Sequence, residues 1–253
     1  MKLEKLDFDK KSNRLSFVLK DSEESFSNTI RRMIIEEVPT LAVEDVEVKE
    51  NSSALYDEML ALRLGLCPIK TDLKSYELKD KCKCGGEGCA RCELKLVLKG
   101  AKKGYIYATE AESMDPKCKF VYAMPVAKLL AKQKIEMQMT AILGKGKEHA
   151  KWSPGIAWYF GWPELKTTAK SNLEAFSKHD AVEAKAGNLK IKDINKWNGA
   201  CEELCEVNGV EVNFSDKDFV FNVESWGQLS GNEMLEKSAE IFLEKLEEFE
   251  KLL

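Results

Sequence analysis

Apolar side chains spaced 4, 3, 4, 3 and 4 residues apart run through residues 233–253, the strongest constraint on how this chain folds. On a helix this spacing forms one narrow stripe, the a and d positions of a heptad pattern. The stripe consists of Leu235, Ala239, Phe242, Leu246, Phe249 and Leu253. Such a helix either covers its own core or packs against another subunit. The aromatic members favour the second interpretation, and a helix of about 20 residues, roughly 30 Å long, could lie across a partner.

A second amphipathic helix is predicted near the N-terminus. Residues 21–25 offer capping oxygens and negative charge at its start, and Pro39 ends it because a residue before proline avoids helical geometry. Its apolar face consists of Phe26, Ile30, Met33 and Ile34. Arg31 and Arg32 adjoin that face. They belong either to a solvated helix surface or to an interface where a guanidinium pairs bidentately with a carboxylate.

Other elements are predicted from shorter patterns. Residues 15–19 alternate as in a half-buried strand. A short helix is expected over residues 54–64, and residues 166–208 are only weakly patterned. The remaining predicted strands are residues 41–48, 94–98 paired with 104–108, 134–141 and 219–224.

Charge is segregated along the chain. The net charge of −4 argues against a basic nucleic-acid binder, yet residues 61–170 carry 21 basic and 11 acidic residues between two acidic segments. This pattern favours a basic middle module, with a random fluctuation of solvated charges as the alternative. The chain has no apolar run of membrane-spanning length and no secretory signal at its start. We therefore expect a cytoplasmic protein that makes no membrane contact.

Four cysteines within eleven residues form the strongest local motif: Cys82, Cys84, Cys89 and Cys92. Four thiolates on a glycine-rich loop can close a tetrahedral shell around one zinc ion. The spacing differs from the usual pattern of a cubane iron–sulfur cluster, so zinc is favoured over a cluster or a loop without metal. Because four cysteines leave no open position for water, the predicted zinc is structural.

Nothing else in the sequence points to chemistry carried by this chain. Cys201 and Cys205 lack a companion pair, so they are expected to be buried or free thiols. No nucleophile elbow, phosphate-binding loop or His-Glu-x-x-His motif occurs, and no catalytic residues are predicted.

Three stretches, in this order along the chain, resemble one family. Residues 25–39 resemble the N-A-L-R-R-I-L-L-x-x-x-P helix of the RNA polymerase alpha subunit. Residues 56–69 resemble the D-E-x-x-A-H-R-L-G-L-I-P-I segment of its archaeal and eukaryotic relatives, and residues 144–155 are similar to their G-x-G-x-E-H-A-K-W-x-P-G stretch. The cysteine loop resembles the zinc loop of the third subunit of eukaryotic RNA polymerase II. The chain is most similar to the archaeal branch of this alpha-like family.

The resemblance implies an α+β fold. A discontinuous two-layer dimerisation domain, a sheet plus long helices, would comprise residues 1–48 and 208–253. A mainly β insert domain, residues 49–165 with the cysteine loop 82–92, would interrupt it on the basic middle of the chain. Residues 166–207 would be the reduced remnant of a ferredoxin-like insertion. They keep only two cysteines and a cubane cluster needs four thiolates, so no iron–sulfur cluster is expected.

The resemblance also implies a non-catalytic assembly subunit of DNA-directed RNA polymerase. The first and last helices would pair with subunit L as a heterodimer, and Arg32 would contact the second-largest subunit. The small subunits N and P would dock on the same platform, with DNA and RNA reached only through the whole complex. Two alternatives remain: an iron–sulfur redox protein and a zinc-containing nucleic-acid-binding protein.

Overall fold

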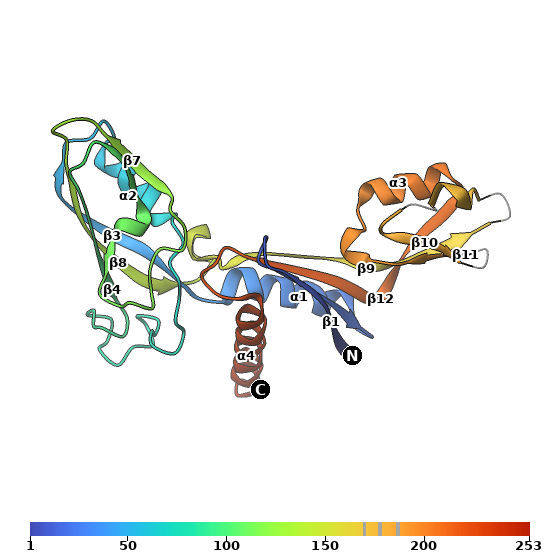
Figure 1. Cartoon of the computed structure of the whole chain (residues 1–253). Coiled ribbons are helices and arrows are strands. Elements are labelled where there is room, and N and C mark those ends of the chain that lie inside the picture. Colours follow the sequence, from blue (N-terminus) through green and yellow to red (C-terminus); the bar gives the residue numbers. More distant parts are fainter. Residues whose placement is uncertain (169–170, 177–178, 186–187) are drawn as a thin grey trace. The chain divides into compact units, whose positions relative to one another are not determined.

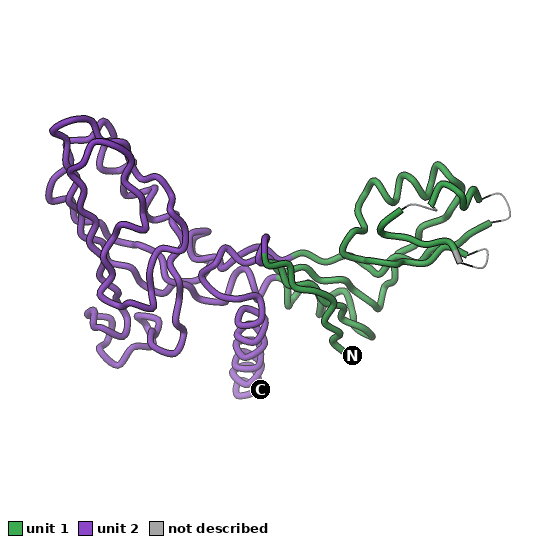
Figure 2. The backbone as a smooth tube through the Cα atoms, in the orientation of Figure 1, with its two compact units in different colours: residues 1–10, 14–31, 158–223 green, residues 11–13, 32–157, 224–253 purple. Residues whose placement is uncertain are grey.

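Antiparallel strand pairs and helices build a fold of the α+β class that the sequence predicts (Figure 1). The computed structural model describes residues 1–168, 171–176, 179–185 and 188–253. Contacts divide the chain into two compact units (Figure 2). Unit 1 comprises residues 1–10, 14–31 and 158–223, and unit 2 comprises residues 11–13, 32–157 and 224–253. The division into a dimerisation domain and an insert remains a prediction, because it concerns partner binding rather than contacts within the chain.

The strands are β1 (Lys2–Asp9), β2 (Arg14–Lys20), β3 (Thr40–Asn51), β4 (Leu94–Gly100), β5 (Gly104–Tyr107), β6 (Glu112–Ser113), β7 (Pro125–Leu129), β8 (Ile135–Gly144), β9 (Gly155–Thr167), β10 (Val182–Lys185), β11 (Asn188–Ile191) and β12 (Val210–Ser225). The α-helices are α1 (Glu24–Arg32), α2 (Asp57–Gly65), α3 (Gly199–Val207) and α4 (Gly231–Glu250), and the π-helical turn η1 (Met33–Glu37) continues α1. Short 3-10 turns are η2 (Ala108–Glu110), η3 (Ala150–Trp152), η4 (Leu173–Phe176) and η5 (Ile194–Lys196). Across the described ranges, every helix is too short or too polar to cross a membrane.

Unit 1 contains most of a four-stranded sheet with the order β1-β2-β12-β9. Strand β2 is buried on both faces, so the predicted half-buried strand is wrong. On one face Phe17 stacks on Phe221, with ring centroids 5.1 Å apart. On the other, Val18 joins an apolar cluster, and the hydroxyl of Ser16 donates a hydrogen bond to Asn222 Oδ1 at 2.8 Å. The polar members of the alternation are thus covered because a second layer packs on that face.

The second layer of unit 1 comes from the weakly patterned segment. The hairpin β10–β11, turns η4 and η5, and helix α3 supply an apolar cluster that includes Phe176, Leu189 and Trp197. Cys201 and Cys205 are buried in this cluster, in agreement with the packing interpretation. Burial raises the pKa of the Cys205 thiol to about 11, which keeps it protonated at neutral pH.

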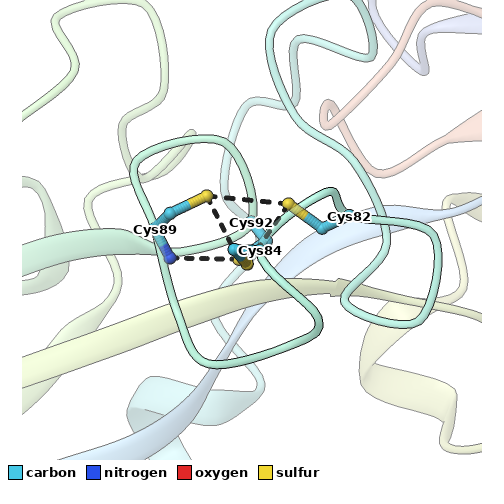
Figure 3. Close-up of side chains that lie close together, drawn as sticks. All are labelled: Cys82, Cys84, Cys89 and Cys92. Atoms are coloured by element: carbon cyan, nitrogen blue, oxygen red, sulfur yellow. Dashed lines mark hydrogen bonds between the residues drawn. The ribbon is translucent and has the colours of Figure 1, made fainter.

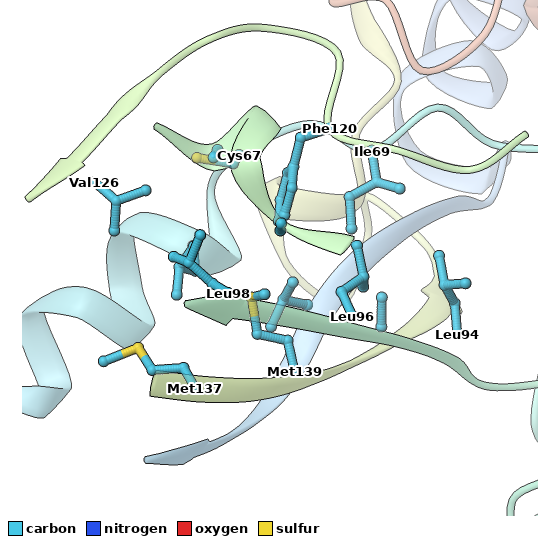
Figure 4. Packing of buried hydrophobic residues seen from close by; sticks show 14 of the residues in the cluster. Cys67, Ile69, Leu94, Leu96, Leu98, Phe120, Val126, Met137 and Met139 are labelled. Atoms are coloured by element: carbon cyan, nitrogen blue, oxygen red, sulfur yellow. The ribbon is translucent and has the colours of Figure 1, made fainter. Parts of the chain in front are cut away.

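Unit 2 is built on the sheet β3-β8-β4-β6, whose inner face forms the largest apolar cluster (Figure 4). Alternate residues of β4 face this core, because successive side chains of a strand point to opposite faces. Opposite them on β8 stand equally buried side chains, in the pairs Leu94–Ala141, Leu96–Met139 and Leu98–Met137. Ile69, Phe120 and Val126 close the cluster from the loops and from β7.

The predicted pairing of residues 94–98 with 104–108 is wrong. Strand β4 pairs with β8 and β6, whereas β5 pairs with β7. The reason lies at Gly100: a Cβ atom added there would lie 2.2 Å from Ile106 Cδ1. The chain therefore folds over the end of β4, and Ile106 packs onto the glycine instead of joining the edge of the strand.

Helix α4 begins two residues before the predicted start. The Ser230 hydroxyl accepts a hydrogen bond from the Glu233 amide at 3.3 Å, and the Glu233 carboxylate accepts one from the Ser230 amide at 2.8 Å. This capping box satisfies two amides that the first helical turn leaves without partners. The predicted long terminal helix is confirmed.

The core of unit 2 provides a direct test of the packing. Leu96→Ala should lower the free energy of unfolding by about 2–5 kcal/mol, because Leu96 is fully buried and its truncation leaves a cavity against Met139. Urea unfolding followed by circular dichroism measures the change. Leu62→Ala removes the same atoms from a side chain that is 62% exposed on α2, and should shift stability by no more than about 0.5 kcal/mol. Equal losses for the two variants would contradict this core.

Candidate metal centre and partner-binding helices

The four predicted metal ligands come together in the loop before β4 (Figure 3). The Sγ atoms of Cys82 and Cys84 are 3.4 Å apart, and that of Cys84 lies 3.6 Å from Cys92. The Sγ atom of Cys89 lies 3.6 Å from that of Cys82 and 3.7 Å from that of Cys92. A tetrahedral shell with Zn–S bonds of about 2.3 Å has sulfur–sulfur edges of about 3.8 Å, so these thiols fit one metal ion. Over the described ranges, this is the one group of three or more Cys, His, Asp or Glu side chains close enough to share an ion.

The loop backbone brings the two cysteine pairs together. Gly86 and Gly88 have φ angles of +85° and +99°, which residues with a Cβ atom rarely adopt. A Cβ atom on Gly88 would lie 2.7 Å from the Glu93 carboxylate. That carboxylate in turn pairs with Lys79 and Lys95, at 2.8 and 3.1 Å, and ties the loop to β4.

The thiols of this loop differ in their proton affinity. A hydrogen bond from the Gly88 backbone amide, followed by one from Cys82, lowers the pKa of the Cys84 thiol to about 6. Burial raises the pKa of the Cys92 thiol to about 12. A divalent cation would replace the remaining thiol protons, because the thiolate is the form that binds metal. The cluster could therefore hold a soft metal ion.

The predicted interface residues of the first helix divide between buried and exposed positions. Ile30, Met33 and Ile34 are buried, and Phe26 is half-buried. The guanidinium of Arg31 donates two hydrogen bonds to Asn28 Oδ1, at 3.1 and 2.9 Å. Phe26, Ile30 and Arg31 belong to unit 1, whereas Arg32, Met33 and Ile34 belong to unit 2.

Arg32 is the exposed member of the arginine pair. Its guanidinium pairs bidentately with the Glu36 carboxylate one turn later, with both nitrogen–oxygen distances at 3.1 Å. The exposed ion pair contributes little to stability, since surface pairs are worth about 0–1 kcal/mol. The carboxylate partner predicted from another subunit is thus matched, within this chain, by Glu36.

Helix α4 presents two different stripes. Met234 and Ser238 are buried against unit 2, and Lys245 continues the same stripe. The heptad stripe lies one residue further round the helix and is increasingly exposed toward the C-terminus: Leu246 is 47% exposed, Phe249 60% and Leu253 93%. Leu235 and Phe242 are half-buried and Ala239 is exposed. The helix thus packs on its own chain with one stripe and leaves much of the heptad stripe uncovered, as large apolar surfaces at interaction sites commonly are.

Sequence reasoning missed the ion cluster that fixes α4. Glu37, at the end of η1, has a side chain that is only 8% exposed. Its carboxylate accepts hydrogen bonds from Lys245 Nζ at 2.6 Å and from Lys145 Nζ at 3.1 Å. Burial raises the pKa of Glu37, but the hydrogen bonds and charges of the two lysines outweigh burial and lower it below its usual value. No local signal could reveal this cluster, because its members are 108 and 208 residues apart.

The stretch 144–155, which carries the most specific resemblance, braces the end of the first helix. A Cβ atom on Gly146 would lie 2.1 Å from the Ile35 carbonyl oxygen, and one on Gly144 would lie 2.4 Å from the Trp152 ring. The Lys147 amide donates a hydrogen bond to the Glu36 carbonyl at 3.0 Å. These glycines allow the loop to lie directly against η1, so the motif is architectural.

Comparisons with known proteins agree with this arrangement. The sequence profile described as the RNA polymerase Rpb3/Rpb11 dimerisation domain matches residues 16–246. A protein of Methanosarcina acetivorans named "DNA-directed RNA polymerase subunit Rpo3" is 35% identical, over 92% of this chain and 91% of its own length. Proteins of the same name from Archaeoglobus fulgidus and Pyrococcus furiosus are 33% and 32% identical. These matches cover 97% and 95% of this chain.

The ion cluster of Glu37 should make stability depend on pH. Glu37→Gln removes the charge between two lysines and should cost about 1–3 kcal/mol of unfolding free energy at pH 7. Because the folded pKa of Glu37 is lowered, its contribution is present above the ordinary value of 4.5 and is lost as the pH falls through the folded pKa. The difference between wild type and variant, measured by urea unfolding, should therefore narrow between pH 7 and pH 3. Glu36→Gln, at the exposed pair with Arg32, should cost under about 0.5 kcal/mol, and a difference for Glu37→Gln that is independent of pH would refute the cluster's role.

Proposed function

Because the chain belongs to the RNA polymerase Rpb3/Rpb11 dimerisation family, we propose that it is a non-catalytic assembly subunit of DNA-directed RNA polymerase. One observation carries this proposal: relatives named as a polymerase subunit match over nine-tenths or more of both chains. The whole complex is a nucleotidyltransferase, and in this proposal its catalytic groups belong to other subunits. The relatives favour neither an iron–sulfur redox protein nor a free-standing nucleic-acid-binding protein.

Subunit L is the proposed partner in a heterodimer. Support comes from the heptad stripe of α4, whose last turns expose Leu246, Phe249 and Leu253. A partner helix would cover these side chains, and burial of apolar surface contributes about 25 cal/mol per Å². The Glu37 cluster would hold α4 at a fixed angle before the partner arrives, which lowers the entropy cost of association.

Further contacts are proposed for the assembled enzyme. Arg32 would reach the second-largest subunit, where a carboxylate of that subunit could compete with Glu36 for the exposed guanidinium. The small subunits N and P would dock on the same platform, and DNA and RNA would be reached through the whole complex. Such an assembly would work in the cytoplasm.

A structural zinc ion is proposed for the cysteine loop. The four sulfur atoms are already near the vertices of a tetrahedron, and all four positions would be filled by protein. When bound, the ion would supply cross-linking of the loop and no chemistry on substrate. The loop could then keep its shape despite the few apolar contacts that it makes.

Removal of the heptad stripe tests the heterodimer. Phe242→Asp with Leu246→Asp should abolish co-purification with subunit L, because association would bury two unpaired charges. Size-exclusion chromatography of the co-expressed chains measures the one-to-one complex. Phe242→Leu with Leu246→Met keeps the stripe apolar and should preserve pairing. Pairing that survives the aspartate variant, with helix content unchanged by circular dichroism, would exclude this stripe as the interface.

Metal analysis tests the zinc site. Purified protein should contain one zinc ion per chain by mass spectrometry, and a strong chelator should lower the melting temperature. Cys84→Ser should abolish the bound zinc, since a three-cysteine shell is incomplete. Cys205→Ser, at a buried thiol of unit 1, should leave the zinc content unchanged. Brown colour with visible absorbance would instead indicate an iron–sulfur cluster.

A further inference from the structure

The outer face of the two-stranded sheet β5–β7 combines aromatic rings with positive charge. Tyr105 and Tyr107 alternate with Ile106 along β5, so both rings lie on one face while Ile106 is buried in the core. Tyr105 is 55% exposed and Tyr107 37%. Their ring centroids are 6.3 Å apart, with the planes inclined at 40°. Two neighbouring aromatic rings are thus presented outward from a rigid strand.

The strand register gathers lysines beside these rings. Gly104 pairs with Leu129, so the segments before β5 and after β7 leave the same end of the sheet. Lys128, opposite Tyr105, places its ammonium 5.3 Å from the centre of that ring. The exposed set Tyr105, Tyr107, Lys102, Lys103, Lys128 and Lys132 is called here the Tyr–Lys face.

The charge of the Tyr–Lys face is not neutralised by the chain. Elsewhere in unit 2 lysines are paired: Lys99 with Glu136 at 3.0 Å and Lys117 with Asp72 at 3.6 Å. The four lysines of the face form no ion pair with any carboxylate of the residues that the structure describes. Four free ammonium groups close together attract an external polyanion.

Lys132 has a backbone that favours glycine. Its φ angle is +68°, in the left-handed region that L-residues with a long side chain seldom adopt. A charged side chain therefore stands at a turn position where glycine would be less strained. The same position offers a variant that removes the charge while relaxing the backbone.

We propose that the Tyr–Lys face binds single-stranded nucleic acid, with phosphates on the lysines and bases stacked on Tyr105 and Tyr107. Grooves that bind single strands combine these same two components, basic groups along the backbone and aromatic rings under successive bases. An acidic protein segment would use the lysines and leave the rings unused. A duplex keeps its bases stacked internally, so the rings favour unpaired bases. The proposal goes beyond the assembly role and uses none of its interface residues.

Base stacking on Tyr105 requires Lys128 to move. The lysine is exposed, and an exposed cation–π contact is weaker than stacking of a base on an aromatic ring. The ammonium would swing toward the phosphate that accompanies the base. Both sources of an unpaired strand, RNA and single-stranded DNA, share this chemistry.

Fluorescence anisotropy with labelled oligonucleotides of about 16 nucleotides, the upper site size of known single-strand modules, tests the proposal on the full chain. RNA, DNA of the same sequence and the corresponding duplex are the three probes. Saturable binding of at least one single strand, tighter than the duplex, is expected at about 50 mM salt. Tyr105→Ala and Tyr107→Ala should each weaken it by about fivefold or more. Preference for RNA or DNA identifies the source.

Charge variants complete the test. Lys132→Gly, and the combination with Lys102→Ala, Lys103→Ala and Lys128→Ala, should reduce the salt dependence by about 0.7 in the logarithmic slope for each lost contact. Lys117→Ala removes a paired lysine outside the face and should have no effect. Absence of saturable binding, equal binding of the duplex, or an equal loss with Lys117→Ala would overturn the proposal. So would unchanged affinity of the tyrosine variants together with displacement by polyglutamate, which would indicate an acidic protein segment. Co-purification with subunit L, measured on the same variants, tests the assembly role separately.

Discussion

The carboxylate of Glu37 is the point on which unit 2 depends. It ends the first helical segment, receives Lys145 from the loop after β8, and receives Lys245 from the last helix. A carboxylate with 8% of its side chain exposed is tolerable only with such partners, because an unpaired buried charge is costly. Three segments that are remote in the sequence are therefore held in one arrangement by two charge-assisted hydrogen bonds.

This arrangement gives α4 two roles at once. The stripe with Met234 and Ser238 is used up in packing against unit 2, so the helix has a defined direction before any partner binds. The adjacent heptad stripe stays largely uncovered toward the C-terminus. A helix with apolar residues on both stripes is poorly suited to a free monomer, but it suits a subunit whose partner completes the core. The glycines at 144 and 146 belong to the same device, since they let the bracing loop touch the Trp152 ring and the Ile35 carbonyl.

Local spacing was a good guide wherever neighbours in the sequence are neighbours in space. The cysteine loop is the clearest case, because all four thiols lie within eleven residues and the glycines between them permit one turn geometry. Strand β1 was not predicted, since its polar and charged residues at a sheet edge leave no apolar alternation. The pairing of β4 with β5 failed because a short connection does not decide which strand edge is filled. The ten-residue β8 offers β4 a longer ladder and three buried side-chain pairs.

By itself the sequence determined the helical periods, the heptad stripe, the metal-ligand set and the family, because each depends on residue types at short spacing. Only the tertiary structure decided which stripe of α4 is covered, that Glu37 joins two lysines, and that the Tyr–Lys face forms beside β5 and β7. These features link residues between about twenty and 208 positions apart. Their formation depends on the free energy of whole competing arrangements, in which buried charge, cavity and strand register are weighed together, and no local pattern encodes that sum.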